Sequence, residues 1–202
     1  MTKVIGICGL IGSGKGTVAD ILIRLHSHRK MSFADSLKDV VSVVFGWPRD
    51  LLEGDTSRSR AWREMPDQWW ASYLGIPELT PRWILQNWGT ELFRENFHQD
   101  IWILSLQNKL REAAANNVHV VLPDTRFPNE IEMIRQLGGE VWLVRRGPDP
   151  DWLADYIMNG TEPKDQHPSE WKWARSYFDH IIYNNGTLDD LKAEVSQAVA
   201  RG

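Results

Sequence analysis

The chain has 202 residues, of which 42% are hydrophobic and 25% are charged, so it is long enough for one soluble domain with a substantial core. Its formal net charge of -4 argues against binding to long DNA or RNA, which requires a basic face. That charge still permits a small anionic ligand held by a local cluster of cations. The single cysteine, Cys8, has no partner for an internal disulfide, which favours a reducing compartment.

No stretch of the sequence is apolar for long enough to span a lipid bilayer. The first ten residues, "MTKVIGICGL", run directly into a glycine-rich loop and contain no small-residue cleavage site, so we do not expect a signal peptide. Together these features predict a cytoplasmic protein.

Strands and helices alternate along the first part of the chain. Residues 3–8, "KVIGIC", form a short β-branched run that is typical of a buried strand. A helix is predicted over 16–26, a short strand over 30–34 and a second helix over 35–45.

The pattern breaks between residues 46 and 81, where prolines, a polar middle and clustered tryptophans appear. We interpret this stretch as an inserted helical or irregular subdomain. Regular elements resume after it, and a second irregular insertion is expected at about 147–179. The later helices are predicted at 81–97, 101–116, 129–138 and 187–200, and the later strands at 118–124, 139–146 and 180–186. Such alternation predicts an α/β protein with a parallel sheet covered on both faces.

The segment from Gly9 to Lys15 has the form G-x-x-x-x-G-K and lies between a predicted strand and a predicted helix. Glycines let successive backbone N–H groups point inward at a polyphosphate, and the helix N-terminus adds a partial positive charge. Lys15 would then reach the β- and γ-phosphates. The alternative is a tight glycine turn with an exposed lysine, but the strand–loop–helix context favours phosphate binding.

The residue after the lysine departs from the usual Ser or Thr, because Gly16 stands there and Thr17 follows. This ending, G-K-G-T, is similar to that of the adenylate-kinase-like nucleoside monophosphate kinases. We therefore expect Thr17 to supply the hydroxyl group for Mg²⁺, directly or through water. The dinucleotide pattern G-x-G-x-x-G fits poorly, because Thr17 occupies the place of its last glycine.

Asp124 ends the apolar run "VHVVLPD". In a parallel sheet its carboxylate would lie at the C-terminal edge beside the glycine loop and could hold the Mg²⁺ shell, although strands often end in Asp for turn chemistry alone. Arg126 would emerge at the same edge, where a guanidinium can bind a phosphate; alternatively it pairs with Asp124 or Glu130. Glu130 begins the next helix and can cap it.

Further candidates lie in the middle of the chain. Lys38 falls in the first turn of a predicted helix, where a positive charge is unfavourable unless an anion offsets it. Asp35 is equally well explained as a helix N-cap. Arg82 and Gln86 share a helix face. An amide can read a base edge and an indole such as Trp88 can stack on it, although core packing is the alternative for any single tryptophan.

Six segments of the chain resemble, in order, the deoxynucleoside monophosphate kinases of tailed phages and their bacterial relatives: "GLIGSGKGTVAD", "FADSLKD", "RWILQNWGTELFRENF", "VVLPDTRFPNEIEMIRQLGGEVWLVRRG", "HPSE" and "IIYNNGTLDDL". The Q-x-x-G-T-E/D and P-D-x-R runs are more specific than the loop. The resemblance implies a P-loop nucleoside-monophosphate-kinase-like fold of three layers, with a five-stranded parallel sheet. It also implies one kinase domain, with 46–81 as its NMP-binding part and 147–179 as its lid.

The resemblance implies three sets of site residues. We expect ATP to contact Gly12, Ser13, Gly14, Lys15, Gly16, Thr17, Arg146, Asn184 and Gly186. We expect the acceptor nucleotide to contact Asp35, Lys38, Arg82, Gln86, Trp88, Gly89, Thr90, Arg126 and Glu130. The residues expected to act directly in phosphoryl transfer are Lys15, Lys38, Asp124 and Arg126, with Thr17 and Asp124 at Mg²⁺. His167 and Glu170 match a lid motif to which no role is assigned.

The predicted reaction is in-line transfer of the γ-phosphoryl group of MgATP to a deoxynucleoside monophosphate (dNMP). Both nucleotides are anionic, so the task is to hold them together and to spread their charge. The expected partners are small nucleotides, without polymeric nucleic acid or membrane; the family and the Trp-rich segment also suggest a homodimer. A phage-encoded chain would act in the host cytoplasm.

Other functions remain open from the sequence. One is another small-molecule P-loop kinase, such as a dephospho-CoA-kinase-like enzyme in which Asp35 serves as a base. Another is a nucleotide-binding switch without catalysis, although the many cations at predicted cleft edges argue against it. A kinase that acts on a DNA base is disfavoured by the acidic net charge.

Overall fold

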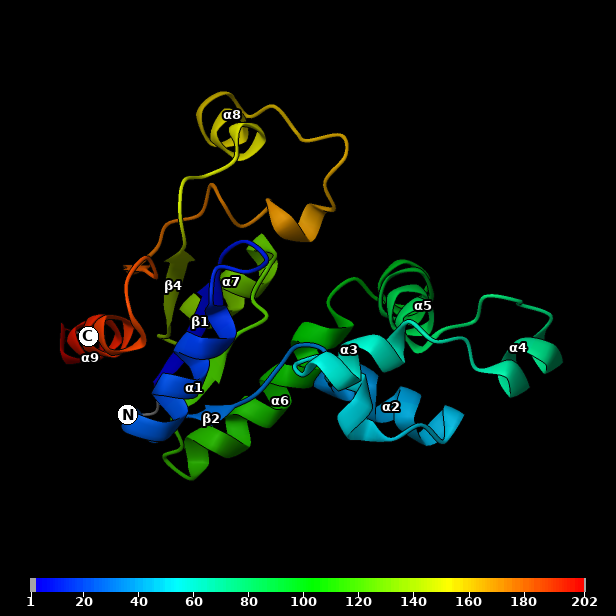
Figure 1. Cartoon of the computed structure of the whole chain (residues 1–202). Coiled ribbons are helices and arrows are strands. Elements are labelled where there is room, and N and C mark those ends of the chain that lie inside the picture. The colour runs from blue at the N-terminus through cyan, green and yellow to red at the C-terminus, as the bar shows by residue number, and fades with distance from the viewer. Residues whose placement is uncertain (1–2, 202) are drawn as a thin grey trace. The chain divides into compact units, whose positions relative to one another are not determined.

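The computed structural model describes residues 3–201, and the chain divides into two compact units. The first unit contains the residues up to Ser32 and those from Gln107 onward, and the second contains Phe33–Leu106. The second unit is therefore larger than the predicted insertion at 46–81 and includes the helices that flank it (Figure 1).

A five-stranded parallel sheet forms the centre of the first unit, as the sequence predicted. Its strands are β1 (Val4–Cys8), β2 (Arg29–Lys30), β3 (Val120–Leu122), β4 (Glu140–Arg145) and β5 (His180–Tyr183), in the spatial order β2-β3-β1-β4-β5. The chain order reverses at β1, which pairs with β3 on one side and β4 on the other. The segments that follow these three strands therefore emerge together at one edge, where α/β proteins bind their ligands.

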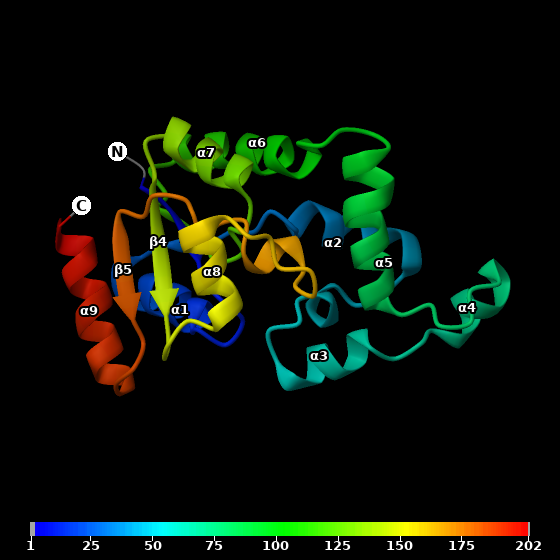
Figure 2. The same cartoon turned by 90° about the horizontal axis from the view of Figure 1, so that it is seen from above.

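Helices cover both faces of this sheet. Helices α1 (Lys15–His26) and α9 (Leu188–Arg201) pack on one face, around buried side chains such as Ile7, Leu22 and Trp142. Helix α7 (Pro128–Gln136) packs on the other face (Figure 2). A Cβ atom on Gly6 would lie 2.4 Å from Ile134 Cδ1, so the close packing of α7 on β1 requires glycine there.

All five strands are shorter than the sequence predicted, and at β2 and β3 side-chain hydrogen bonds follow directly after the strand. β2 covers 29–30 instead of 30–34: after Met31 donates its N–H to Val121 O, the Ser32 hydroxyl bonds to a side chain at the edge of β3. β3 ends at Leu122, whose carbonyl accepts the Thr125 hydroxyl at 3.1 Å and so closes a turn.

The segment between β4 and β5 is less irregular than predicted. It contains a two-turn helix, α8 (Asp151–Asn159), and a short 3-10 turn, η3 (Pro168–Glu170). Buried Leu153, Trp171 and Trp173 anchor it.

The second unit is helical. It contains α2 (Asp35–Phe45), η1 (Arg49–Leu52), α3 (Ser57–Arg63), α4 (Gln68–Leu74), α5 (Pro81–Asn87), η2 (Trp88–Glu95) and the first residues of α6 (Ile101–Ala115). Thr56, Asp67 and Thr80 cap α3, α4 and α5 through their side-chain oxygens. The single helix predicted over 81–97 is continuous, but its second half, η2, is π-helical.

Aromatic side chains fill the core of the second unit. Phe45 stacks on Trp47 at 4.4 Å between ring centroids, and Trp88 lies 5.2 Å from the same phenyl ring. Trp102 is also buried there. The clustered tryptophans thus give short helices enough buried area to form a core of their own.

We predict that Leu22→Ala lowers the free energy of unfolding by about 2–5 kcal/mol, because it leaves a cavity in a closely packed core. Leu22 is fully buried, whereas Leu25, one turn along α1, is 55% exposed. The matched variant Leu25→Ala should change the same quantity by less than about 1 kcal/mol. Urea unfolding followed by circular dichroism measures both, and equal losses would contradict this account of the core.

Candidate active site

The loop between β1 and α1 has a backbone that only glycine adopts readily. Gly9, Gly12 and Gly14 have φ angles of 144°, 81° and 103°, in the region that L side chains avoid. A Cβ atom would lie 2.4 Å from Val144 O at Gly9, and 2.2 Å from Asn184 Nδ2 at Gly14. Backbone conformation and close packing therefore both require glycine at these two positions.

Lys15 begins α1 and folds back across this loop. Its Nζ atom donates hydrogen bonds to Gly9 O at 2.7 Å and to Leu10 O at 2.8 Å. Burial and, to a smaller extent, the positive charge of Arg126 lower the pKa of Lys15 to about 8, while the carboxylate of Glu170 opposes both effects. A partly desolvated ammonium next to a second cation is a favourable place for an anion.

Arg126 follows β3 and reaches the segment between β4 and β5. Its Nη1 atom donates to Glu170 Oε1 at 3.0 Å and to Ser169 Oγ at 3.2 Å. The other carboxylate oxygen of Glu170 accepts the backbone N–H of Ile11, in the glycine loop, at 3.3 Å. The first unit thus brings Lys15, Arg126 and Glu170 together. The sequence carried no signal for the Glu170 contacts, because its partners are 44 and 159 residues away.

Asp124 lies in the turn just after β3, half-buried, and its Oδ2 atom accepts the Ser32 hydroxyl at 2.5 Å. Ser32 was not among the predicted site residues. Thr17 is exposed in the first turn of α1. Within residues 3–201 no group of three or more His, Cys, Asp or Glu side chains could hold a metal ion. The oxygen donors of Thr17 and Asp124 suit Mg²⁺, which usually takes one or two protein carboxylates and completes its shell with water and phosphate oxygens.

Glu130 plays a structural part in this unit. It is only 2% exposed, and its Oε2 atom accepts the N–H groups of Arg126 at 2.8 Å and Phe127 at 3.1 Å. The carboxylate therefore caps α7 and fixes the backbone of Arg126, instead of facing a ligand as a substrate-binding residue would.

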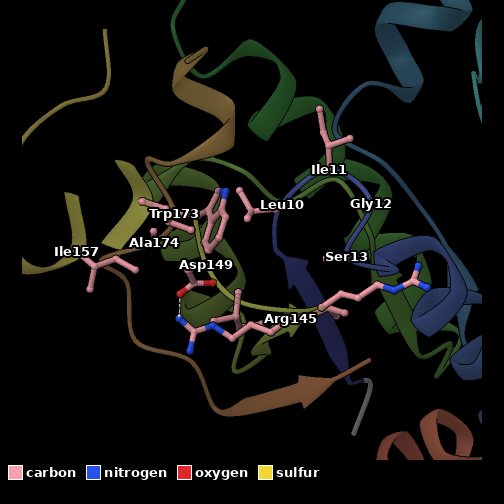
Figure 3. Close-up of a pocket in the computed structure, with 13 residues that line it drawn as sticks. Leu10, Ile11, Gly12, Ser13, Arg145, Asp149, Ile157, Trp173 and Ala174 are labelled. Atoms are coloured by element: carbon pink, nitrogen blue, oxygen red, sulfur yellow. Dashed lines mark hydrogen bonds and ion pairs between the residues drawn. The ribbon is translucent and has the colours of Figure 1, made fainter. Parts of the chain in front are cut away.

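The turn after β5 is tied to the glycine loop. Asn184 donates from Nδ2 to Ser13 O at 2.9 Å, and Gly186 lies in the same turn. Arg146 is exposed after β4 and, together with residues of the loop, lines a cavity of about 150 Å³. Figure 3 shows this cavity, with Arg145 paired to Asp149 in its wall.

The remaining predicted residues belong to the second unit. Lys38 is buried and forms an ion pair with Glu53 at 2.7 Å. Arg82 is exposed and pairs with Glu64 at 3.0 Å. Arg63 was not among the predicted site residues; burial lowers its pKa, and the nearby charge of Arg82 lowers it further.

Other predicted residues of this unit differ in accessibility. Gln86 and Thr90 are exposed, whereas Gly89 is buried and its carbonyl accepts the Trp102 indole N–H at 2.9 Å. Trp88 packs in the aromatic core, as noted above. Asp35 pairs with Arg49 at 3.3 Å.

A glycine loop closed by a lysine, at the reversal point of a parallel sheet, defines a phosphate-binding α/β protein of the P-loop class. The family model of deoxynucleotide monophosphate kinases matches residues 74–195. A protein of Acanthamoeba polyphaga mimivirus, named after the same family, is 30% identical over 97% of this chain and 95% of its own length. The chain therefore belongs to the deoxynucleotide monophosphate kinase family, as its sequence motifs predicted, and is a kinase by that membership.

A second kinase is similar to this chain in sequence, and a solved structure is similar to it in fold. The deoxynucleoside-5'-monophosphate kinase of Escherichia phage T5 is 26% identical over 96% of this chain and 95% of its own. The crystal structure of TT1252 from Thermus thermophilus superposes with a TM-score of 0.53 at 20% identity, covering 99% of this chain and 97% of that one. The latter likeness concerns the fold alone. No helix within residues 3–201 has the length and apolar character needed to cross a membrane.

We predict that anion binding at the glycine loop weakens as the pH rises through about 8, the lowered pKa of Lys15. Above that pH the ammonium loses its proton and no longer attracts an anion. A bound phosphate favours the charged form and raises the pKa, so binding under alkaline conditions should take up a proton. Calorimetric titration with ADP at about pH 7 and about pH 9, in buffers of different ionisation enthalpy, measures this uptake.

The control is Lys15→Arg, because a guanidinium stays charged throughout this range. Proton uptake should disappear in that variant. If the same uptake persists, a group other than Lys15 is responsible.

Proposed function

We propose that this chain uses ATP to phosphorylate dNMPs, with the corresponding diphosphate and ADP as products. The observation that carries the proposal is the meeting of Lys15 and Arg126 at the glycine loop, where the charge of Arg126 contributes to the lowered pKa of Lys15. Two like charges side by side favour an anion, and in the ligand-free protein the carboxylate of Glu170 is that anion. A polyphosphate is another such anion, and family membership supports a nucleotide as its carrier.

The donor nucleotide is proposed to bind in the first unit. The loop amides and the N-terminus of α1 would hold its phosphates, with Lys15 at the β- and γ-phosphates. Asn184 and Gly186 are proposed to flank the adenine. The hydrogen bond from Asn184 to Ser13 O supports this, because it keeps the turn after β5 beside the loop. Arg146 is proposed to approach the donor from the end of β4.

Magnesium is proposed to bind between the donor phosphates and the oxygens of Thr17 and Asp124. Thr17 lies in the first turn of α1, and Asp124 follows β3, the neighbour of β1, by two residues, so both belong to the edge of the sheet from which the loop emerges. When bound, the ion would neutralise charge on the β- and γ-phosphates. Arg126 is proposed to stabilise the phosphoryl group in transfer.

The acceptor nucleotide is proposed to bind to the second unit. Lys38 and Arg82 would hold its phosphate, joined by Arg63, whose lowered pKa reflects burial and the charge of Arg82. The exposed helix residues Gln86 and Thr90, with Trp88 and the backbone at Gly89, are proposed to shape the site for the base and sugar. Asp35 and Glu130 have internal partners, so we assign them supporting roles.

No general base is required in this reaction, because the acceptor phosphate is already ionised. The protein's contribution is therefore to position two anions in line and to neutralise their charge. The segments 46–81 and 147–179 are proposed to act as the NMP-binding part and the lid, which close over the nucleotides and exclude water.

A coupled assay of ADP release separates the candidate functions. We expect activity with dNMPs, tested as a panel beside ribonucleoside monophosphates and dephospho-CoA. Activity with dephospho-CoA alone would show that the acceptor is a hydroxyl compound and not a dNMP. Slow ATP hydrolysis that no acceptor stimulates would instead indicate a nucleotide-binding switch.

We predict that Lys15→Ala lowers kcat by at least about a hundredfold, because it removes a preorganised positive charge from the phosphates. The matched change Lys192→Ala alters a lysine on α9 whose partner is Asp189, and it should leave kcat within about twofold. Circular dichroism checks that both variants fold. Near-normal turnover by folded Lys15→Ala would refute the role of the loop.

A further inference from the structure

The carboxylate of Glu170 accepts hydrogen bonds from donors that, in the proposed function, bind a phosphate. One oxygen accepts the N–H of Ile11 in the glycine loop at 3.3 Å, and the other accepts Arg126 Nη1 at 3.0 Å. Its charge also raises the pKa of Lys15 against the effect of burial, so the ammonium lies within its electrostatic reach. A single carboxylate thus interacts with an amide, a guanidinium and an ammonium of the phosphate site.

A short turn, anchored by packing, places Glu170 at this position. It is the last residue of η3, in which His167 Nδ1 accepts the N–H of Ser169 at 3.3 Å. The next residue, Trp171, is only 3% exposed. The side chain of Glu170 is itself only 14% exposed. The packing of the segment therefore fixes the position of the Glu170 side chain at the loop.

A phosphate and this carboxylate compete for the same donors. Both are anions that bind through oxygen atoms, and the N–H of Ile11 is a single donor that makes one good hydrogen bond. Their negative charges also repel at such short range. A phosphate that takes these contacts must therefore displace Glu170.

We propose that Glu170 is an internal counter-anion that occupies the donors of Arg126 and the glycine loop until a nucleotide phosphate displaces it. The inference rests on the proposed function, because it assumes that the loop binds phosphate. It makes Glu170 a competitor of phosphate in the ligand-free protein. Nucleotide binding is then coupled to the release of η3 from the loop.

This arrangement has a consequence that a purely supporting residue would not have. Only the molecules in which Glu170 has left the loop bind phosphate, so the apparent dissociation constant is the intrinsic constant divided by the fraction of such molecules. Weakening the carboxylate should therefore tighten phosphate binding, although it removes a side chain that contacts two groups of the site. Loss of a supporting residue would weaken binding instead.

The test is calorimetric titration of the full chain with inorganic tripolyphosphate. We expect Glu170→Gln and Glu170→Ala to lower the dissociation constant by about tenfold, with Ala at least as effective because it leaves no oxygen to accept from Ile11. The matched control is Glu162→Gln, an exposed carboxylate of the same segment. It changes the net charge equally and should shift the constant by less than about twofold.

The outcomes separate this inference from the proposed function. If the unaltered protein binds tripolyphosphate and both Glu170 variants bind it equally well or more weakly, the counter-anion role is wrong while phosphate binding stands. If folded protein binds no tripolyphosphate with or without Glu170, the loop is not a phosphate site and both proposals fall. An equal gain in Glu162→Gln would assign the effect to net charge and would also overturn the inference.

Discussion

The concentration of positive charge at the glycine loop is the constraint on which the first unit depends. Lys15 is partly desolvated and lies within the field of Arg126, an arrangement that is costly unless the surrounding structure enforces it. The enforcing contacts are internal: Glu130 fixes the backbone of Arg126 from within the fold, and Asn184 fixes the loop at Ser13. The packing of the unit thus maintains a site whose electrostatics favour an anion.

Three of the predicted anion-binding cations have a carboxylate partner within their own unit. Arg126 pairs with Glu170, Lys38 with Glu53 and Arg82 with Glu64. A ligand-free site with several cations would otherwise repel itself. The chain has 27 acidic residues against 23 basic ones. This excess is compatible with binding anionic nucleotides, because some of the carboxylates neutralise the cations of the predicted binding sites.

The two units reach stability by different means. The first relies on a parallel sheet whose strands are buried by helices on both faces. The second has only short helices, which bury little area individually, and it compensates with large aromatic side chains such as Phe45, Trp47 and Trp102. The unusual tryptophan content of the chain is thus mainly a packing device. Trp88 illustrates the overlap, since it packs against Phe45 in this core and is also a candidate for contact with a base.

Local patterns in the sequence determined the glycine loop and the alternation of strands and helices, because each depends on residues within one short window. Motifs spread along the chain also predicted its family. Tertiary structure alone decided which side chains engage each other across the fold. Glu130 turned inward to cap a helix, β2 ended early beside Asp124, and Glu170 reached Arg126 and Ile11 across 44 and 159 residues. Such contacts arise from the packing of whole elements, and no local window of sequence contains that information.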